Sequence, residues 1–177
     1  MKILLSDSSV LLNLLATDCL ASIAAATGWQ FAICTAVRDE AKKLRDSQNG
    51  EMVEVDITPH IGGLLQVLEL SGEEEQTLYV EQSINVDDGE AMSMAIAAHR
   101  HLELAIDDKQ AANHTRRKFP EIHLWSTPQI VKHWAEAGSV DAKLVRDTLR
   151  LIEIRSRYFP PKSHALAEWL RQSKGNA

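Results

Sequence analysis

The sequence predicts a single α/β domain in three layers, with a central parallel sheet of about five strands between flanking helices. Two observations lead to this fold class. Short apolar segments alternate with longer segments of helical periodicity, as in right-handed βαβ units whose helices cover both faces of a sheet. The chain has 177 residues, 45% apolar and 25% charged, which suits one folded domain and excludes disordered, collagen-like and low-complexity proteins.

The first half of the chain is predicted to contain three strands and three helices. The strands are residues 2–6, 31–34 and 52–57, and the helices are residues 8–26, 35–45 and 64–70. Gly28 ends the first helix, and Thr35 is the expected N-cap of the second. Asn49-Gly50 forms the turn before the third strand.

The second half continues this alternation and then becomes helical. Its strands are residues 102–106 and 122–124, and its helices are residues 71–83, 87–101, 111–118, 128–137, 140–156 and 163–173. We therefore expect one domain over residues 1–177, with a core over about residues 1–135 and a C-terminal helical extension over about residues 138–177.

Charge and cysteine content narrow the class of protein further. A net charge of −6 disfavours a protein that coats nucleic acid by charge alone. Cys19 and Cys34 lie in apolar stretches and are typical of buried thiols in a reducing compartment. Because no run of about 18 uninterrupted apolar residues is present, we expect a cytoplasmic protein without membrane association.

Acidic residues directly follow two of the predicted strands. Asp7 follows the first strand, and Asp107 and Asp108 follow the fourth. Ligands of open parallel sheets bind outside the carboxyl ends of the strands, so these carboxylates meet at one edge if the two strands are neighbours. Glu40, in the first turns of the helix after the second strand, and Glu90, in the first turn of the helix before the fourth, can reach the same cleft.

Carboxylates gathered in one cleft repel one another. At about 4 Å and an effective dielectric constant of about 20, a like-charge pair costs about 4 kcal/mol. Such a cluster persists by taking up protons or by binding a hard divalent cation. Hard cations held by oxygen ligands commonly catalyse phosphodiester cleavage, because one ion activates water and a second stabilises the leaving oxygen. The acids therefore indicate metal-dependent phosphodiester hydrolysis.

Each acid also has a purely structural interpretation. Asp7 can be the N-cap of the first helix, and Glu40 can pair with Lys43 on a solvated helix face. Asp87 and Glu90 have the spacing of a capping box. The two acids after the fourth strand can simply start a turn. The conjunction of all of them is more specific than any one and favours a site.

Five stretches, taken in order, carry a resemblance to a known family and cover nearly the whole chain. They are ILLSDSSVLLNLL at residues 3–15, AVRDEA at 36–41, DGEAMSMAIA at 88–97, LAIDDK at 104–109, and the C-terminal segments 127–138 and 144–152. These stretches resemble PIN-domain nucleases, in particular a prokaryotic subgroup related to VapC-type toxins. The resemblance implies a ribonuclease that uses one or two Mg²⁺ or Mn²⁺ ions.

The resemblance also implies roles for particular residues. The implied catalytic and metal-binding acids are Asp7, Glu40, Glu90 and one of Asp107 and Asp108, with Asp108 favoured for direct ligation. Ser9 matches a small hydroxyl position that holds Asp7 or a water molecule, and Asn13 assists more weakly from the next turn. Members of the family often carry an Arg shortly after the last acids, where this chain offers Lys109. Arg116, Arg117 and Lys118 come later, either as nucleic-acid contacts or as a solvated helix end.

Alternatives to a stand-alone ribonuclease remain open at this point. The same fold can serve as a non-catalytic binding module or a toxin component, in which the acids bind a basic protein partner such as an antitoxin. The extra helices through Trp169 can cover an apolar flank, form a homodimer or bind that partner. A receiver-like or other α/β phosphohydrolase would also need a Lys after a later strand, and this chain has none there.

Overall fold

The computed structural model describes residues 2–40 and 42–175. Its centre is a five-stranded sheet in the order β5-β2-β1-β6-β7, in which every neighbouring pair runs parallel. The strands are β1 (Lys2–Ser6), β2 (Trp29–Cys34), β5 (Leu65–Leu68), β6 (Glu103–Ala105) and β7 (Leu124–Trp125). In the middle strand, Leu4 pairs with Phe31 of β2 and with Glu103 of β6.

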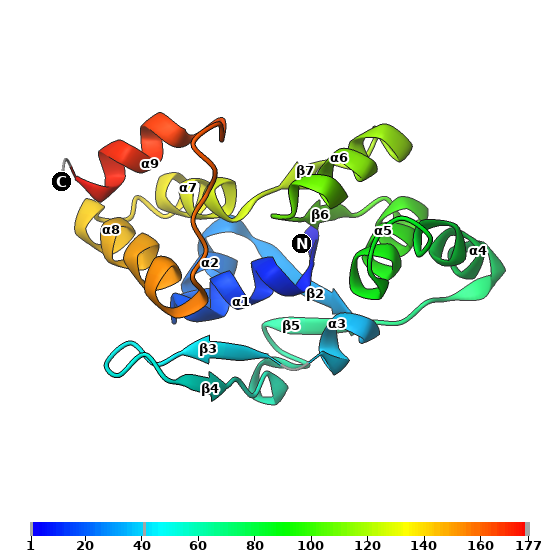
Figure 1. Cartoon of the computed structure of the whole chain (residues 1–177), viewed down its shortest axis with the longest axis horizontal. Helices are drawn as coiled ribbons and strands as arrows, with labels where there is room; N and C mark the ends of the chain where they lie inside the picture. The colour runs from blue at the N-terminus through cyan, green and yellow to red at the C-terminus, as the bar shows by residue number, and fades with distance from the viewer. Residues whose placement is uncertain (1, 41, 176–177) are drawn as a thin grey trace.

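Helices cover both sides of this sheet (Figure 1). They are α1 (Ser8–Ala16), α2 (Leu20–Thr27), α3 (Thr35–Asp39), α4 (Gly72–Gln82), α5 (Asp88–Arg100), α6 (Lys109–Lys118), α7 (Thr127–Ala137), α8 (Ala142–Leu151) and α9 (Ala167–Lys174). On one side α5 packs across β1, β2 and β6, with α4 outside it. On the other side α1 and α2 contact β1 and β2, and α7 packs against both helices. The predicted three-layer α/β fold is confirmed.

The burial of β2 explains why its sequence lacks the alternation of a surface strand. All six residues of β2 are buried, as is usual for a parallel strand covered on both faces. The same core includes Leu4 and Leu5 of β1, Leu104 of β6 and Trp134 of α7.

The first predicted helix is broken in the structure. The predicted helix 8–26 is divided into α1 and α2, whose axes differ by 106°, with residues 17–19 between them. The Thr17 hydroxyl donates to the Leu14 carbonyl at 2.6 Å and accepts from the Cys19 amide at 3.0 Å, while Asp18 has a left-handed φ of 56°. The hydroxyl thus replaces backbone bonds that would continue the helix. No single described helix is long and apolar enough to cross a membrane, although this bent pair taken together has sufficient length and apolar composition.

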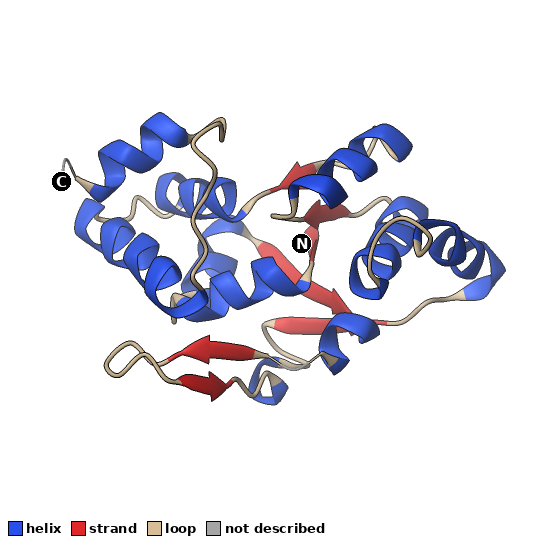
Figure 2. Cartoon of the chain, viewed as in Figure 1, coloured by secondary structure: helices blue, strands red, loops and turns tan. Residues whose placement is uncertain are grey.

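One other predicted helix is too long, another is wrong, and one predicted strand lies outside the main sheet. The helix 35–45 is instead α3 followed by β3 (Lys43–Arg45), and the helix 64–70 is instead β5. The strand 52–57 is β4 (Met52–Glu54), which forms an antiparallel hairpin with β3 beside the main sheet (Figure 2). The periodicity of a short apolar run does not distinguish a strand from a buried helix. Residues 65–68 form a strand because they pair with β2.

The C-terminal region adds one feature to the prediction. The predicted helix 140–156 is α8 continued by a π-helical turn, η2 (Ile152–Ser156), and the predicted helix 163–173 is α9. Between η2 and α9, residues 157–166 form an irregular segment that we call the strap (Figure 1). Its side chains Tyr158 and His164 contact Asp107 and Ser126, the residues that follow β6 and β7. The strap therefore reaches the edge of the sheet where the acids lie.

Candidate metal centre

The predicted neighbours β1 and β6 do lie side by side, and they bring their terminal acids together. Ser6 pairs with Ala105, and the Asp7 amide donates to the Ala105 carbonyl at 3.0 Å. The Asp107 amide in turn points to Oδ2 of Asp7 at 3.4 Å. The carboxyl ends of two parallel strands thus place Asp7 and Asp107 at one edge of the sheet, as expected from the topology.

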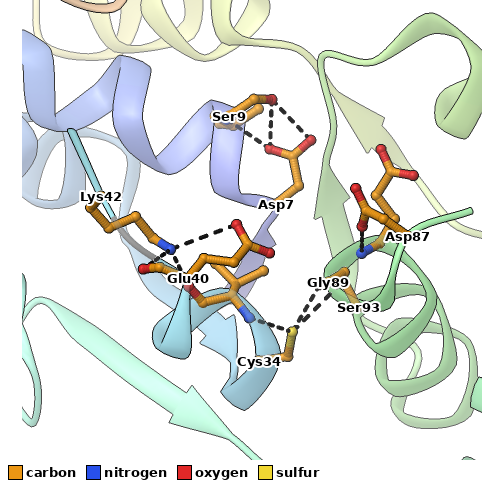
Figure 3. A network of polar contacts seen from close by, with 11 residues as sticks. Asp7, Ser9, Cys34, Glu40, Lys42, Asp87, Gly89 and Ser93 are labelled. Atoms are coloured by element: carbon orange, nitrogen blue, oxygen red, sulfur yellow. Dashed lines mark hydrogen bonds and ion pairs between the residues drawn. The ribbon is translucent and has the colours of Figure 1, made fainter. Parts of the chain in front are cut away.

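A cavity of 130 Å³ at this edge is lined by acids from four parts of the chain. Its acidic lining residues are Asp7, Glu40, Asp87, Glu90 and Asp108, and Ser8, Ser9, Val37 and Gly89 complete the wall. Figure 3 shows Asp7 beside α1, Glu40 beside α3 and Asp87 at the start of α5. The structure therefore brings together four of the predicted acids and adds Asp87, which the sequence had indicated only as a cap.

Three of these acids are helix N-caps, so the structural and the functional interpretations hold at once. Asp7, Asp87 and Asp108 cap α1, α5 and α6, and each accepts the backbone amide three residues further on, at 2.7, 2.8 and 2.8 Å respectively. Ser9 also donates to both oxygens of Asp7, at 3.0 and 3.1 Å. Three helix N-termini consequently converge on the cavity, and their dipoles favour negative charge there.

The electrostatics of the cavity are unfavourable for full ionisation. Asp7 is only 4% exposed, and burial, followed by the charge of Asp107, raises its pKa to about 7 against the opposing hydrogen bonds. Burial, followed by the charges of Asp87 and Asp108, likewise raises the pKa of Glu90 to about 7. Two carboxyl groups are therefore partly protonated near neutral pH, which is the expected response of crowded acids that lack a counter-charge.

The donor set fits a hard divalent cation, although the side chains stand apart. Within residues 2–40 and 42–175, no three Asp, Glu, His or Cys side chains are placed closely enough to hold an ion together. The cavity nevertheless exposes carboxylate and hydroxyl oxygens without thiol or imidazole, which is the ligand chemistry of Mg²⁺ and Mn²⁺. Mutual repulsion keeps such carboxylates apart, and a cation would offset it. Metal ligation by these residues stays a prediction.

Asp107 differs from its neighbour Asp108 because its oxygens are already occupied. Oδ1 accepts the Thr127 amide and the Tyr158 hydroxyl, both at 2.9 Å. Oδ2 accepts the Thr127 hydroxyl at 2.5 Å and the Asn13 amide at 2.9 Å. Asp107 therefore ties β6 to α7, α1 and the strap, whereas Asp108 lines the cavity. Asn13, predicted to assist the metal, reaches the site only through Asp107 and Thr127.

Glu40 lies just beyond α3 rather than inside a longer helix. It is the C-cap of α3 with extended backbone, φ −67° and ψ 143°. Lys42, whose side chain is 2% exposed, donates to the carbonyls of Val37 and Glu40 and lies 3.8 Å from the Glu40 carboxylate. Burial lowers the pKa of Lys42. This lysine, absent from the sequence-based site, closes the end of α3 and fixes where Glu40 leaves it.

Gly89 and Cys34 join the two acid-bearing helices α3 and α5 (Figure 3). A Cβ atom on Gly89 would lie 2.8 Å from Oε1 of Glu40, so a larger residue there would displace the carboxylate end of that side chain. The buried thiol of Cys34 lies 3.6 Å from the Gly89 carbonyl, and Ser93 donates to its sulfur at 3.4 Å. A glycine in the first turn of a helix was the available sequence signal, since glycine there is otherwise unfavourable.

The predicted basic residues lie along α6, beside the acids rather than among them. Lys109 follows Asp108 at the start of α6, and Arg116, Arg117 and Lys118 lie in its last turn. Lys109 and Arg117 line a neighbouring cavity of 600 Å³, whereas Lys109 and Arg116 line another of 260 Å³. This placement suits contacts to phosphates outside the acidic cavity, which remains a prediction.

One comparison with known proteins gives a match. The family model DUF3368, described as a PIN domain, matches residues 3–173. This range includes the whole main sheet apart from Lys2, the first residue of β1. No curated protein and no solved structure matches the chain. PIN domains are generally nucleases and generally use divalent metal ions. The relation to VapC-type toxins stays a prediction.

Proposed function

This chain belongs to the PIN-domain family, and from that premise we propose that it is a Mg²⁺- or Mn²⁺-dependent endoribonuclease. The observation that supports the proposal is the cavity into which five carboxylates face, three of them held in place as helix N-caps. A divalent ion bound there would lower the pKa of water and offset charge on the scissile phosphate.

The residues divide into ligands and positioning groups. We assign direct ligation of one ion to Asp7, Glu90 and Asp108, which face the same cavity. Glu40, which lines the same cavity from the end of α3, binds a second ion or accepts a proton from the attacking water. Asp107 is a positioning residue, because its hydrogen bonds set the end of β6 immediately before Asp108. Ser9 orients Asp7 through both carboxylate oxygens.

Basic residues must bind the substrate backbone, because the acidic cavity repels a polyanion. Lys109, Arg116, Arg117 and Lys118 lie on the helix that Asp108 caps. A strand of nucleic acid along α6 would therefore place one phosphate next to the acids and others beside these cations.

The proposal is tested with a single-stranded RNA oligonucleotide and a DNA of the same sequence, incubated with Mn²⁺, Mg²⁺ or a chelator. We expect internal cleavage of the RNA that requires the ion and is abolished in Asp7→Asn. The matched control is Asp141→Asn, the same change at the exposed N-cap of α8, which should cleave like the wild type. Cleavage that survives in Asp7→Asn would reject the assignment. A wild type that neither cleaves nor gains stability with the ions would favour the non-catalytic binding module.

A further inference from the structure

A second cavity opens at the same edge of the sheet, beneath the strap. It has a volume of 260 Å³ and lies at the carboxyl ends of β6 and β7, one strand further from the acids. Its walls come from α6, from the start of α7 and from the strap. The residues used below are Lys109, Asn113, Arg116, Gln129, Tyr158 and Ser163. We call it the strap cavity.

The strap is fixed over this cavity by hydrogen bonds at two points. Near one end, the Tyr158 hydroxyl donates to Asp107 at 2.9 Å. Near the other, Nδ1 of His164 accepts the Leu166 amide at 3.0 Å, so its Nε2 carries the proton and donates to Ser126 Oγ at 3.0 Å. The strap cavity is therefore a built feature of the domain, closed on one side by an anchored segment.

Two side-chain amide groups in the wall of the strap cavity are available as hydrogen-bond donors. Ser126 donates its own hydroxyl proton to Oε1 of Gln129 at 2.9 Å, and this oxygen also accepts the Ser126 amide at 2.9 Å. The Nε2 group of Gln129 then has no hydrogen-bond partner among the described residues. Asn113, on the facing helix, accepts from Arg116 with its Oδ1 at 3.1 Å, and its Nδ2 has no partner within residues 2–40 and 42–175.

Charge and shape restrict what can enter. Lys109 and Arg116 are exposed cations at the wall, and the one acid there, Asp107, has both oxygens occupied. Trp125 and Tyr158 are also among the residues that line the cavity. The volume lies just below the roughly 300–1,000 Å³ typical of pockets for drug-sized ligands, so the cavity suits a single small unit rather than a longer segment.

We propose that the strap cavity binds one unstacked nucleotide of a single-stranded substrate, adjacent to the phosphate presented to the acids. This inference rests on the proposed ribonuclease function. Lys109 follows Asp108 directly, so a phosphate held by Lys109 is within one nucleotide of the acidic cavity. The free amides contact the edge of the base, and Arg116 contacts the next phosphate. A paired base cannot enter, because recognition in such a pocket needs a base splayed out of its stack.

Binding is tested first without cleavage, by NMR on the wild-type chain in a chelator. Adenosine and uridine 5′-monophosphate are titrated, with orthophosphate and the free nucleosides as comparison. We expect the nucleotides to shift the side-chain amide signals of Asn113 and Gln129, and to shift them more than orthophosphate or nucleoside does. Absence of these shifts at millimolar nucleotide would overturn the proposal. Equal shifts with orthophosphate alone would do so too, because they would show a simple anion site.

Two variants connect the strap cavity to cleavage. Ser163→Trp fills the cavity, and its control Lys162→Trp changes the adjacent residue, which lines a different cavity beside α9. We expect Ser163→Trp to abolish the nucleotide-induced shifts and to lower kcat/KM on single-stranded RNA about tenfold, the size of one base-stacking contact. Lys162→Trp should match the wild type. Equal kcat/KM for both variants would reject the subsite.

Arg116→Gln separates phosphate contact from base contact. It should reduce the slope of log affinity for single-stranded RNA against log salt by about 0.7, the value for one lost phosphate contact. Arg150→Gln, a change at an exposed residue of α8, is the control and should leave the slope unchanged. An unchanged slope in Arg116→Gln contradicts the proposed phosphate contact. Nucleotide binding without any metal-dependent cleavage would retain the subsite and reject the ribonuclease, so the two proposals fail separately.

Discussion

Replacing Asp7 with asparagine should stabilise the metal-free protein while it abolishes cleavage. The pKa of Asp7 rises from 3.8 to about 7 on folding, mainly through burial. Each pKa unit corresponds to about 1.4 kcal/mol, so ionised Asp7 destabilises the folded state by up to about 4 kcal/mol. Asparagine is neutral and remains a good N-cap for α1, so the variant avoids this penalty and keeps the capping bond.

The raised pKa of Asp7 determines how the free energy of unfolding changes with pH. Because the folded state binds the Asp7 proton more tightly than the unfolded state, the wild type loses stability as the pH rises from about 4 to about 7. Above pH 7 the full penalty remains. Asp7→Asn should therefore exceed the wild type in free energy of unfolding at pH 8, and the difference should shrink toward zero near pH 4.

Urea denaturation in a chelator at pH 4.5, 6 and 8 measures this difference. Asp141→Asn, at the exposed N-cap of α8, controls for the change of side chain and should leave stability within about 0.5 kcal/mol of the wild type at each pH. Excess Mn²⁺ should stabilise the wild type by about 2.7 kcal/mol at a hundredfold excess over Kd, and the variant far less. A variant less stable than the wild type at pH 8 would refute the reasoning, because burial of Asp7 would then not be the dominant cost.

Three further changes test the groups that position the acids. Gly89→Ala should lower kcat about tenfold or more by displacing the Glu40 carboxylate. Differential scanning calorimetry should show stability unchanged or raised by up to about 1 kcal/mol. Full activity would contradict the close approach of Gly89 to Glu40. Lys42→Met should cost about 1–3 kcal/mol in urea denaturation, because the buried Val37 carbonyl and the part-buried Glu40 carbonyl lose their donor. Exposed Lys43→Met should change stability by less than about 0.5 kcal/mol, and equal losses for the two variants would refute this. Tyr158→Phe should cost about 1 kcal/mol in the same assay, because the aspartate after β6 keeps three other hydrogen bonds.

The strands of the sheet were predicted best where an apolar run is followed directly by an acidic residue. The strands at residues 2–6 and 102–106 have clear apolar character and are followed by Asp7 and Asp107, so their type could be predicted; the first has the predicted boundaries, and the second is one residue shorter at each end. The error at residues 64–70 has a different cause. Those residues become a strand only because β2 offers an unpaired edge, and that partner lies more than thirty residues earlier in the chain. Pairing over such a distance leaves no local periodic signal.

The site shows a similar division between local and distant causes. Asp7, Glu90 and Asp108 could be predicted because each lies at the boundary of a regular element, where capping and catalysis favour the same residue type. Lys42 and Gly89 could not be assigned a role, because both act on Glu40, and the position of Glu40 depends on where α3 ends. The predicted helix extended to residue 45 and carried Glu40 in its first turns, so it gave no role to the residues that follow Glu40. In the structure α3 ends at Asp39, Lys42 donates to the Glu40 carbonyl, and Glu40 lines the cavity beside Gly89.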